Sequence, residues 1–239
     1  MVITRRGMHG QVVDSLGQSI VAGRFAPGQV IDLAELEQQL GASRSVVREA
    51  VRVLADKGLV DARPKRGTVV RGRESWSLLD PDLLRWQYES RTDTAFLSNL
   101  AEVRSIIEPA AAGLAATRRT EEDLVVMREA LQEMEDPAAR PEAIVHADLA
   151  FHRGLLLATH NDLLQRMELV IQTALRSRDE LVHQSEGVEN SAPAHRIVLE
   201  AVEGGDATAA QGAMEALLAL AVQDESLVCS RLDVKAANA

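Results

Sequence analysis

The sequence predicts a mainly α-helical protein in two parts: an N-terminal winged helix-turn-helix domain and a C-terminal all-α helical bundle. First, a short amphipathic segment around Leu36 ends at Gly41, and a second helical segment begins after Ser43 with Arg44 and Arg48 in its first turns. Second, apolar residues recur three and four apart through most of the remaining chain, which is the helical period. Third, aromatic residues make up only 3%, so the core must consist of Leu, Val, Ala and Ile, as suits a helical bundle.

The segment that begins at Ser43 has the pattern of a DNA-recognition helix. Ser43 is a favourable N-cap residue, and Arg44 and Arg48 stand one turn apart. In a helix-turn-helix the second helix enters the major groove, where arginines reach phosphates or guanine edges. Ser43 and Ser45 can bond to backbone oxygens of the DNA. We therefore predict Ser43, Arg44, Ser45 and Arg48 as DNA contacts.

A basic hairpin follows this helix. Lys57 and Gly58 predict the end of the helix, and residues 59–63 and 68–71 predict two short strands. The turn between the strands carries Lys65, Arg66 and Gly67. A tight hairpin at this place is a wing, so we predict that these three residues lie in or over the minor groove.

Several motifs in the first 73 residues resemble the winged-helix domain of GntR-family transcription regulators. The resemblance covers roughly residues 8 to 73 and implies DNA binding. Val46 departs from the usual Pro, and Ala34 replaces a DNA-contacting Arg of the fatty-acid-responsive member, which leaves the operator sequence open. A winged helix used only for protein contacts is the alternative. The motifs are Gly23-Arg24-Phe25-Ala26-Pro27-Gly28, Ser43-Arg44-Ser45-Val46-Val47-Arg48-Glu49-Ala50, Lys57-Gly58-Leu59-Val60 and Arg66-Gly67.

Charge separates the two parts of the chain. Residues 1–73 carry 12 Lys and Arg against seven Asp and Glu, a net +5. The whole chain carries -10, so the remainder carries -15. A basic N-terminal part joined to an acidic remainder fits DNA binding through the N-terminal part alone. We expect a DNA-binding domain over 1–73, a linker and connecting helix over 74–90, an effector-binding and dimerisation domain over 91–232, and a polar tail over 233–239.

Cysteine content and hydropathy indicate a cytoplasmic protein without a membrane partner. Cys229 is the single cysteine, so no disulfide framework within the chain is possible, which suits a reducing compartment. No apolar run approaches the ~20 residues that span a bilayer, and the chain opens without a signal peptide.

The body is predicted to contain a series of helices and no strand after residue 70. Asp80 and Pro81 have the pattern of a helix start in the connecting segment. Pro109 is expected to bend the first long helix, and prolines 137 and 141 separate the next two. The expected helices run over about 97–114, from Thr120, and over about 144–159, 161–184, 192–203 and 206–230.

Motifs in this body resemble the ligand-binding FCD domain of the FadR subfamily. The resemblance implies a small-molecule effector site. The segment from Trp76 to Trp86 is similar to repressors of sugar-acid operons, galactonate operons especially. The motifs are Glu102-Val103-Arg104-Ser105-Ile106-Ile107-Glu108-Pro109-Ala110-Ala111, Asp148-Leu149-Ala150-Phe151-His152, Ala158-Thr159-His160-Asn161 and Ala194-His195-Arg196-Ile197-Val198.

One pair in these motifs has metal-ligand spacing. Asp148 and His152 lie four residues apart on a helix, so both point the same way and can bind one divalent metal such as Zn²⁺. The FCD resemblance adds His195 as a third ligand. Many such domains use a further His in the last helix, but that place falls at Leu217, which leaves at most three ligands. A buried polar cluster without metal is the alternative.

Arg104 is the main candidate for effector binding. It shares the inner register with Leu100 and Ile107, and a buried arginine needs a partner. Glu108, four residues on, is the ordinary partner. The family resemblance implies instead that Arg104 binds an effector carboxylate through the paired N–H donors of its guanidinium group.

Further residues complete the predicted effector site. His183 and Ser191 are candidates for its lining. The three metal candidates belong to it as well, since open metal positions can accept effector oxygens. The effector site is therefore predicted to comprise Arg104, Asp148, His152, His195, His183 and Ser191.

These observations predict a ligand-controlled transcription regulator. We expect a repressor of a galactonate- or gluconate-type operon that binds double-stranded operator DNA as a homodimer and is released by its effector. Alternatives are a related regulator that responds to another small carboxylate, such as lactate or a fatty-acid derivative, and an architectural DNA binder without effector. A metal-dependent hydrolase is a remote alternative. We expect no enzyme, because no separate general base or nucleophile is evident.

Overall fold

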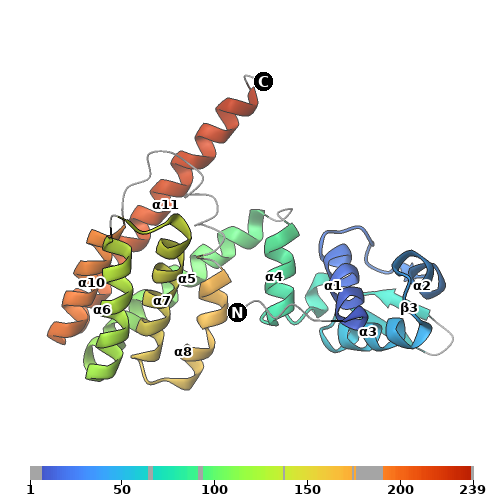
Figure 1. The fold of residues 1–239 in the computed structure, drawn as a ribbon, viewed down its shortest axis with the longest axis horizontal. Coiled ribbons are helices and arrows are strands. Elements are labelled where there is room, and N and C mark those ends of the chain that lie inside the picture. Colours follow the sequence, from blue (N-terminus) through green and yellow to red (C-terminus); the bar gives the residue numbers. More distant parts are fainter. Residues whose placement is uncertain are drawn as a thin grey trace. The chain divides into compact units, whose positions relative to one another are not determined.

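The computed structural model describes residues 7–63, 67–90, 94–136, 138–173, 175 and 191–237. Contacts divide the chain into two compact units, Met1–Phe96 and Leu97–Ala239. The prediction of a mainly α protein with an N-terminal winged helix and a C-terminal helical domain is confirmed (Figure 1). No helix in the described ranges is long and apolar enough to cross a membrane.

The N-terminal unit has the helix order and hairpin of a winged helix. Its elements are α1 (Met8–Val21), β1 (Val30–Ile31), α2 (Leu33–Leu40), α3 (Arg44–Asp56), β2 (Val60–Arg63), β3 (Gly67–Val70), the 3-10 turn η1 (Arg73–Ser75) and α4 (Pro81–Ser90).

The turn between α2 and α3 forms as expected at one end and differently at the other. α2 ends at Gly41, whose φ of 59° lies in the left-handed region that favours glycine. Ser43 occupies the N-cap position of α3, but its side chain makes no capping hydrogen bond. The Ser43 hydroxyl lies 3.0 Å from the Ser45 hydroxyl instead. Ser43 is therefore the N-cap residue by position, as predicted, without a capping hydrogen bond from its side chain.

The wing belongs to a three-stranded antiparallel sheet in the order β1-β3-β2. β2 and β3 match the two predicted strands, with Arg63 paired to Gly67 across the hairpin. β1 was not predicted; Val30 and Ile31 pair with Val69 and Thr68. Two residues are too few to show an alternating pattern, so the sequence carries no periodic signal for this strand.

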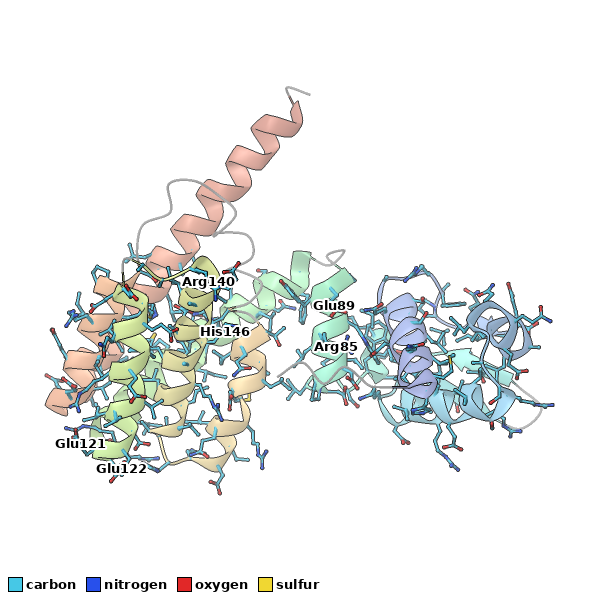
Figure 2. All side chains as sticks on the ribbon, viewed as in Figure 1. Arg85, Glu89, Glu121, Glu122, Arg140 and His146 are labelled. Carbon is cyan, nitrogen blue, oxygen red and sulfur yellow. The ribbon has the colours of Figure 1, made fainter. Side chains whose placement is uncertain are left out.

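Helix α4 packs within the N-terminal unit. Trp86 is fully buried in the same core cluster as residues of α1, and its indole N–H donates to Asp14 at 3.2 Å. Arg85 also reaches Asp14 at 2.6 Å, and Glu89 accepts a hydrogen bond from Gln18 (Figure 2). The division into a connecting segment over 74–90 stays a prediction, but the helix in that segment is anchored to α1.

The C-terminal unit is entirely helical in its described residues. The helices are α5 (Thr94–Arg118, whose first residues belong to the N-terminal unit), α6 (Glu121–Glu135), α7 (Pro141–Leu157), α8 (Asp162–Arg166), α10 (Ala192–Gly204) and α11 (Ala207–Ala237). α6 contacts α7 and α10, and α10 contacts α11 (Figure 1). The described residues of their shared core are Leu, Val and Ala, as the composition predicts, together with Met127, Met134, Met214 and the aromatic Phe151.

The helix ends differ from the expected ones in three places. α5 continues through Pro109 to Arg118. The single helix expected over 161–184 is interrupted, because α8 ends at a turn at Met167 before helical residues resume at 168; residues 176–184 lie outside the described part. α11 runs to Ala237 and so includes most of the segment expected as a polar tail.

Candidate functional site

The exposed face of α3 carries the predicted DNA contacts. Val47, Ala50 and Leu54 are fully buried and fix the opposite face of the helix in the core. Arg44 and Arg48 are therefore exposed on the outer face. Both arginines and Ser45 line a concave surface formed with residues of α2, β2 and β3, and the hollow that it encloses has a volume of about 1180 Å³. An exposed, preformed basic helix beside a hairpin can enter a groove of DNA.

Not all predicted DNA contacts can be placed. Lys65 and Arg66 lie outside the described residues. Gly67 begins β3 with a φ of 79° and lines the concave surface. Arg52, which the sequence reasoning did not assign, lines the same surface one turn beyond Arg48. The four-residue spacing of the arginines was the signal that could have identified it.

The three predicted metal ligands come together in the C-terminal unit. Asp148 and His152 lie on α7 and His195 on α10, and all three are buried. One ligand atom from each lies within 4.8 Å of the others. His195 Nε2 is 3.1 Å from Asp148 Oδ1 and 3.3 Å from His152 Nε2, and His152 Nε2 is 3.9 Å from Asp148 Oδ2.

The second nitrogen of each imidazole faces an acceptor. His195 Nδ1 lies 2.9 Å from the backbone carbonyl of Ser191. His152 Nδ1 lies 2.6 Å from Glu108 Oε2. Because the ring N–H is not in line with that oxygen, the second contact is a close electrostatic one and not an aligned hydrogen bond. With an acceptor beside each Nδ1, both Nε2 atoms face Asp148, which is the orientation of metal-binding histidines.

The spacing of these atoms suits a small divalent ion. Bonds of about 2.1 Å to His nitrogen and carboxylate oxygen place neighbouring ligand atoms roughly 3.0 Å apart at right angles and roughly 3.4 Å apart at tetrahedral angles. The two distances of His195, 3.1 and 3.3 Å, fall in this range, and the third is longer. The donor set, one carboxylate and two imidazoles, is one that Zn²⁺ accepts. The group can therefore bind a metal.

Arg104 has the ordinary partner that its sequence position suggests. Its Nε donates to Glu108 Oε1 at 2.6 Å, and the side chains of both residues are buried. Burial alone would raise the pKa of Glu108, but the Arg104 guanidinium and His152 outweigh burial and lower this pKa to about 2. Glu108 is therefore an ionised carboxylate in the interior of the unit.

Glu108 connects two parts of the predicted site that the sequence treated separately. Its two oxygens face Arg104 and His152. Sequence reasoning paired Glu108 with Arg104 but missed His152. No sequence signal could have found that contact, because the two residues lie on different helices, 44 positions apart.

A small cavity lies beside Arg104. It has a volume of about 290 Å³, near the lower end for ligand pockets. Residues of α5, including Arg104 and Ser105, form one wall, and residues of α11, including Glu215 and Leu218, form the other. Among the described residues that line it, none belongs to the group of Asp148, His152 and His195.

The remaining candidates are spread over the unit. His183 lies outside the described residues. Ser191 is half-buried and orients His195 through its carbonyl. Leu217 is buried in the core cluster. His146 is exposed on α7 (Figure 2), and His160 contacts Asp123.

The comparisons with known proteins agree with this architecture. Residues 9–70 match the model of bacterial regulatory proteins of the gntR family, and residues 99–220 match the FCD domain. The galactonate operon transcriptional repressor of Escherichia coli (strain K12) is 32% identical over 212 residues, covering 87% of this chain and 93% of that protein. The regulator LutR of Bacillus subtilis (strain 168) is 32% identical, covering 82% and 91%.

A solved structure shows the same fold. The protein Lar, which controls expression of the Listeria monocytogenes agr system, has a TM-score of 0.62 at 21% identity, with 93% of this chain and 98% of that one covered. A winged helix with an exposed basic recognition helix, followed by an all-α domain, defines a transcription regulator that binds DNA. The chain belongs to the GntR family of these regulators and carries an FCD domain.

Proposed function

We propose that the protein represses a catabolic operon for a sugar acid of the galactonate or gluconate type and leaves its operator when the sugar acid binds the C-terminal unit. The observation that carries this proposal is the buried group of Asp148, His152 and His195, next to a charged pair that includes Arg104. The similarity of most of the chain to the galactonate operon repressor of Escherichia coli supports the sugar-acid class.

The DNA contacts of this proposal are the exposed residues of α3 and the wing. Ser43, Arg44, Ser45 and Arg48 reach the major groove, and Lys65, Arg66 and Gly67 reach the minor groove. Neither Arg44 nor Arg48 makes a hydrogen bond or ion pair with another described residue. Both guanidinium groups can therefore engage DNA without breaking an internal contact.

A divalent metal such as Zn²⁺ is proposed for the buried group. Asp148, His152 and His195 hold it, and Leu217 supplies no fourth ligand. When bound, the metal supplies a positive charge with open positions that carboxylate and hydroxyl oxygens can occupy. The Ser191 carbonyl, 2.9 Å from Nδ1, orients the ring of His195.

An acidic body needs local positive charge to bind an anion. The chain beyond residue 73 carries a net -15, so its overall field repels a sugar acid. Arg104 is a buried cation beside the small cavity, and its guanidinium has the planar geometry that matches a carboxylate. We propose that Arg104 holds the effector carboxylate and that His183 and Ser191 contribute to the lining of the site.

The proposed working unit is a homodimer in the cytoplasm on a near-palindromic operator. One winged helix contacts only a short half-site, and two-fold operators match two-fold proteins. Light scattering at micromolar concentration should give twice the chain mass of 25.9 kDa. A monomer that protects single half-sites would contradict this assembly.

A second candidate is a regulator of the same family that senses a less polar carboxylate. The cavity beside Arg104 has an apolar wall that includes Leu218, Ala221 and Val222, which favours lactate or a fatty-acid derivative over a polyhydroxy acid. The hydrolase alternative depends on the same buried group, and turnover of a candidate ligand by the purified protein would support it.

Thermal-shift screening tests the effector class. Galactonate, gluconate, lactate and a short fatty acid would each be added with and without Zn²⁺. A ligand at about 100 times its Kd should stabilise the protein by about 2.7 kcal/mol. We expect a shift with the aldonates that depends on Zn²⁺ and is absent in Asp148→Asn, while exposed Asp162→Asn serves as the matched control. A shift with lactate alone would favour the second candidate.

A further inference from the structure

The proposed functions of Arg104 and His152 do not explain why the buried carboxylate of Glu108 contacts both side chains. Its side chain is 1% exposed, and its two oxygens lie 2.6 Å from Arg104 Nε and 2.6 Å from His152 Nδ1. A buried carboxylate is costly unless its neighbours compensate it. Arg104 Nε donates to Oε1, so the contact of Oε2 with the imidazole calls for a separate explanation.

The contact decides which nitrogen of His152 carries hydrogen. A carboxylate is only an acceptor, and an ionised oxygen 2.6 Å from Nδ1 attracts an N–H bond and repels a lone pair on that nitrogen, even though the bond is not in line with it. In neutral His152 the hydrogen therefore lies on Nδ1, and the lone pair lies on Nε2. That lone pair is directed toward Asp148 and His195, where a metal would be bound.

The opposite tautomer would be unfavourable at both ends of the ring. Hydrogen on Nε2 would leave the Nδ1 lone pair against Glu108. It would also place an N–H where the metal bond must form. His195 Nδ1 lies 2.9 Å from the Ser191 carbonyl, while its Nε2 lies 3.1 Å from Asp148 Oδ1 and can donate to that carboxylate when no metal is bound. The two histidines thus present Nε2 to one point, 3.3 Å from each other.

We propose that Glu108 is a positioning residue for the metal group: it selects the Nδ1–H tautomer of His152 and holds the ring so that Nε2 can bind the metal. This inference rests on the proposed metal site, but its tautomer component does not require metal. The positive charge of Arg104 compensates the buried carboxylate from the side of the other oxygen.

The tautomer is measured first, by ¹⁵N NMR of the metal-free protein with ¹⁵N-labelled histidine. The His152 signals are assigned by their loss in His152→Gln. We expect hydrogen on Nδ1 and a lone pair on Nε2 in the wild type. Hydrogen on Nε2 of wild-type His152 would overturn the proposal, and this result requires no variant of Glu108.

Two variants then separate positioning from general disturbance of the buried pair. Glu108→Gln removes the acceptor charge, whereas Arg104→Lys changes the same pair but keeps Glu108 and a positive charge beside it. We expect a mixture of His152 tautomers in Glu108→Gln and the wild-type tautomer in Arg104→Lys. A single Nδ1–H tautomer in Glu108→Gln would contradict the assignment.

Zn²⁺ affinity, measured by competition with a chromophoric chelator, gives the second readout. We expect the Kd for Zn²⁺ to rise about tenfold to a hundredfold in Glu108→Gln and to stay near the wild-type value in Arg104→Lys. Equal losses in both variants would show that the buried pair only supports folding. A wild type that binds no Zn²⁺ would refute the metal site itself, while the NMR result would still decide the role of Glu108.

Discussion

Arginines spaced along α3 should contribute to DNA binding in different ways. Arg44, Arg48 and Arg52 line the same concave surface at intervals of four residues. Four residues advance a helix by about 6 Å and turn it about 40° beyond a full turn. Arg52 is therefore displaced about 12 Å and about 80° from Arg44. We expect Arg48, near the start of the helix, to read a base, and Arg52 to contact the DNA backbone.

The two single substitutions should differ in kind. Arg48→Ala should cost about 1–3 kcal/mol at the operator, which is roughly a 5- to 150-fold rise in Kd, with relaxed specificity at one position. Arg52→Ala should weaken all duplexes and lower the slope of log K against log salt by about 0.9. Stability should change little, because the contact of Arg52 with Glu49 spans 3.5 Å between exposed side chains.

Fluorescence anisotropy can distinguish these outcomes. Operator and scrambled duplexes would be titrated between about 50 and 200 mM salt, with exposed Arg140→Ala in the C-terminal unit as the control. Equal weakening of both duplexes by Arg48→Ala would contradict base reading. An unchanged salt slope in Arg52→Ala would contradict the backbone contact.

Two further predictions concern stability. Gly17→Ala should destabilise the N-terminal unit by about 1–3 kcal/mol, because a Cβ there would lie 2.5 Å from the Trp86 ring. The control is Gly212→Ala, where an added Cβ would meet nothing within 4 Å. Equal Tm values of the two variants would contradict the packing of α4 on α1. Partial burial raises the pKa of Asp123, but hydrogen bonds from Thr120 and His160 outweigh it and lower this pKa. The ionised carboxylate therefore stabilises the fold above its unfolded pKa. This stabilisation is lost as the pH falls through the lowered pKa of the folded state. Asp123→Asn should lower Tm at pH ~7, and the difference from wild type should shrink toward pH ~3; a constant difference in thermal melts would refute the linkage.

Much of the fold could be predicted because local chemistry marks it. Gly41 ends α2 as its left-handed backbone requires, and the acidic first turn after Thr120 forms a capping box. The pairing of Asp148 with His152 follows from helical spacing alone. The break after α8 at Met167 was missed, because the apolar spacing continues across it.

The parts of the site that depend on contacts between helices could not be derived from spacing. The contact of Glu108 with His152 joins α5 to α7, and His195 was predicted only through family resemblance. The segment from Trp76 to Trp86 resembles repressors of sugar-acid operons, and its Trp86 is buried with residues of α1 in the N-terminal unit. Trp86 therefore anchors α4 to α1 and is not part of the predicted effector site.

Release of operator DNA by an aldonate tests the central claim most directly. Galactonate and gluconate would be titrated into the operator complex with Zn²⁺ present, with Arg104→Ala and Asp148→Asn compared to the wild type. A coupling of about 3 kcal/mol should weaken wild-type DNA binding by more than a hundredfold, whereas both variants should stay bound. No release of the wild type by any aldonate up to millimolar concentration, or equal release of all three proteins, would contradict the account.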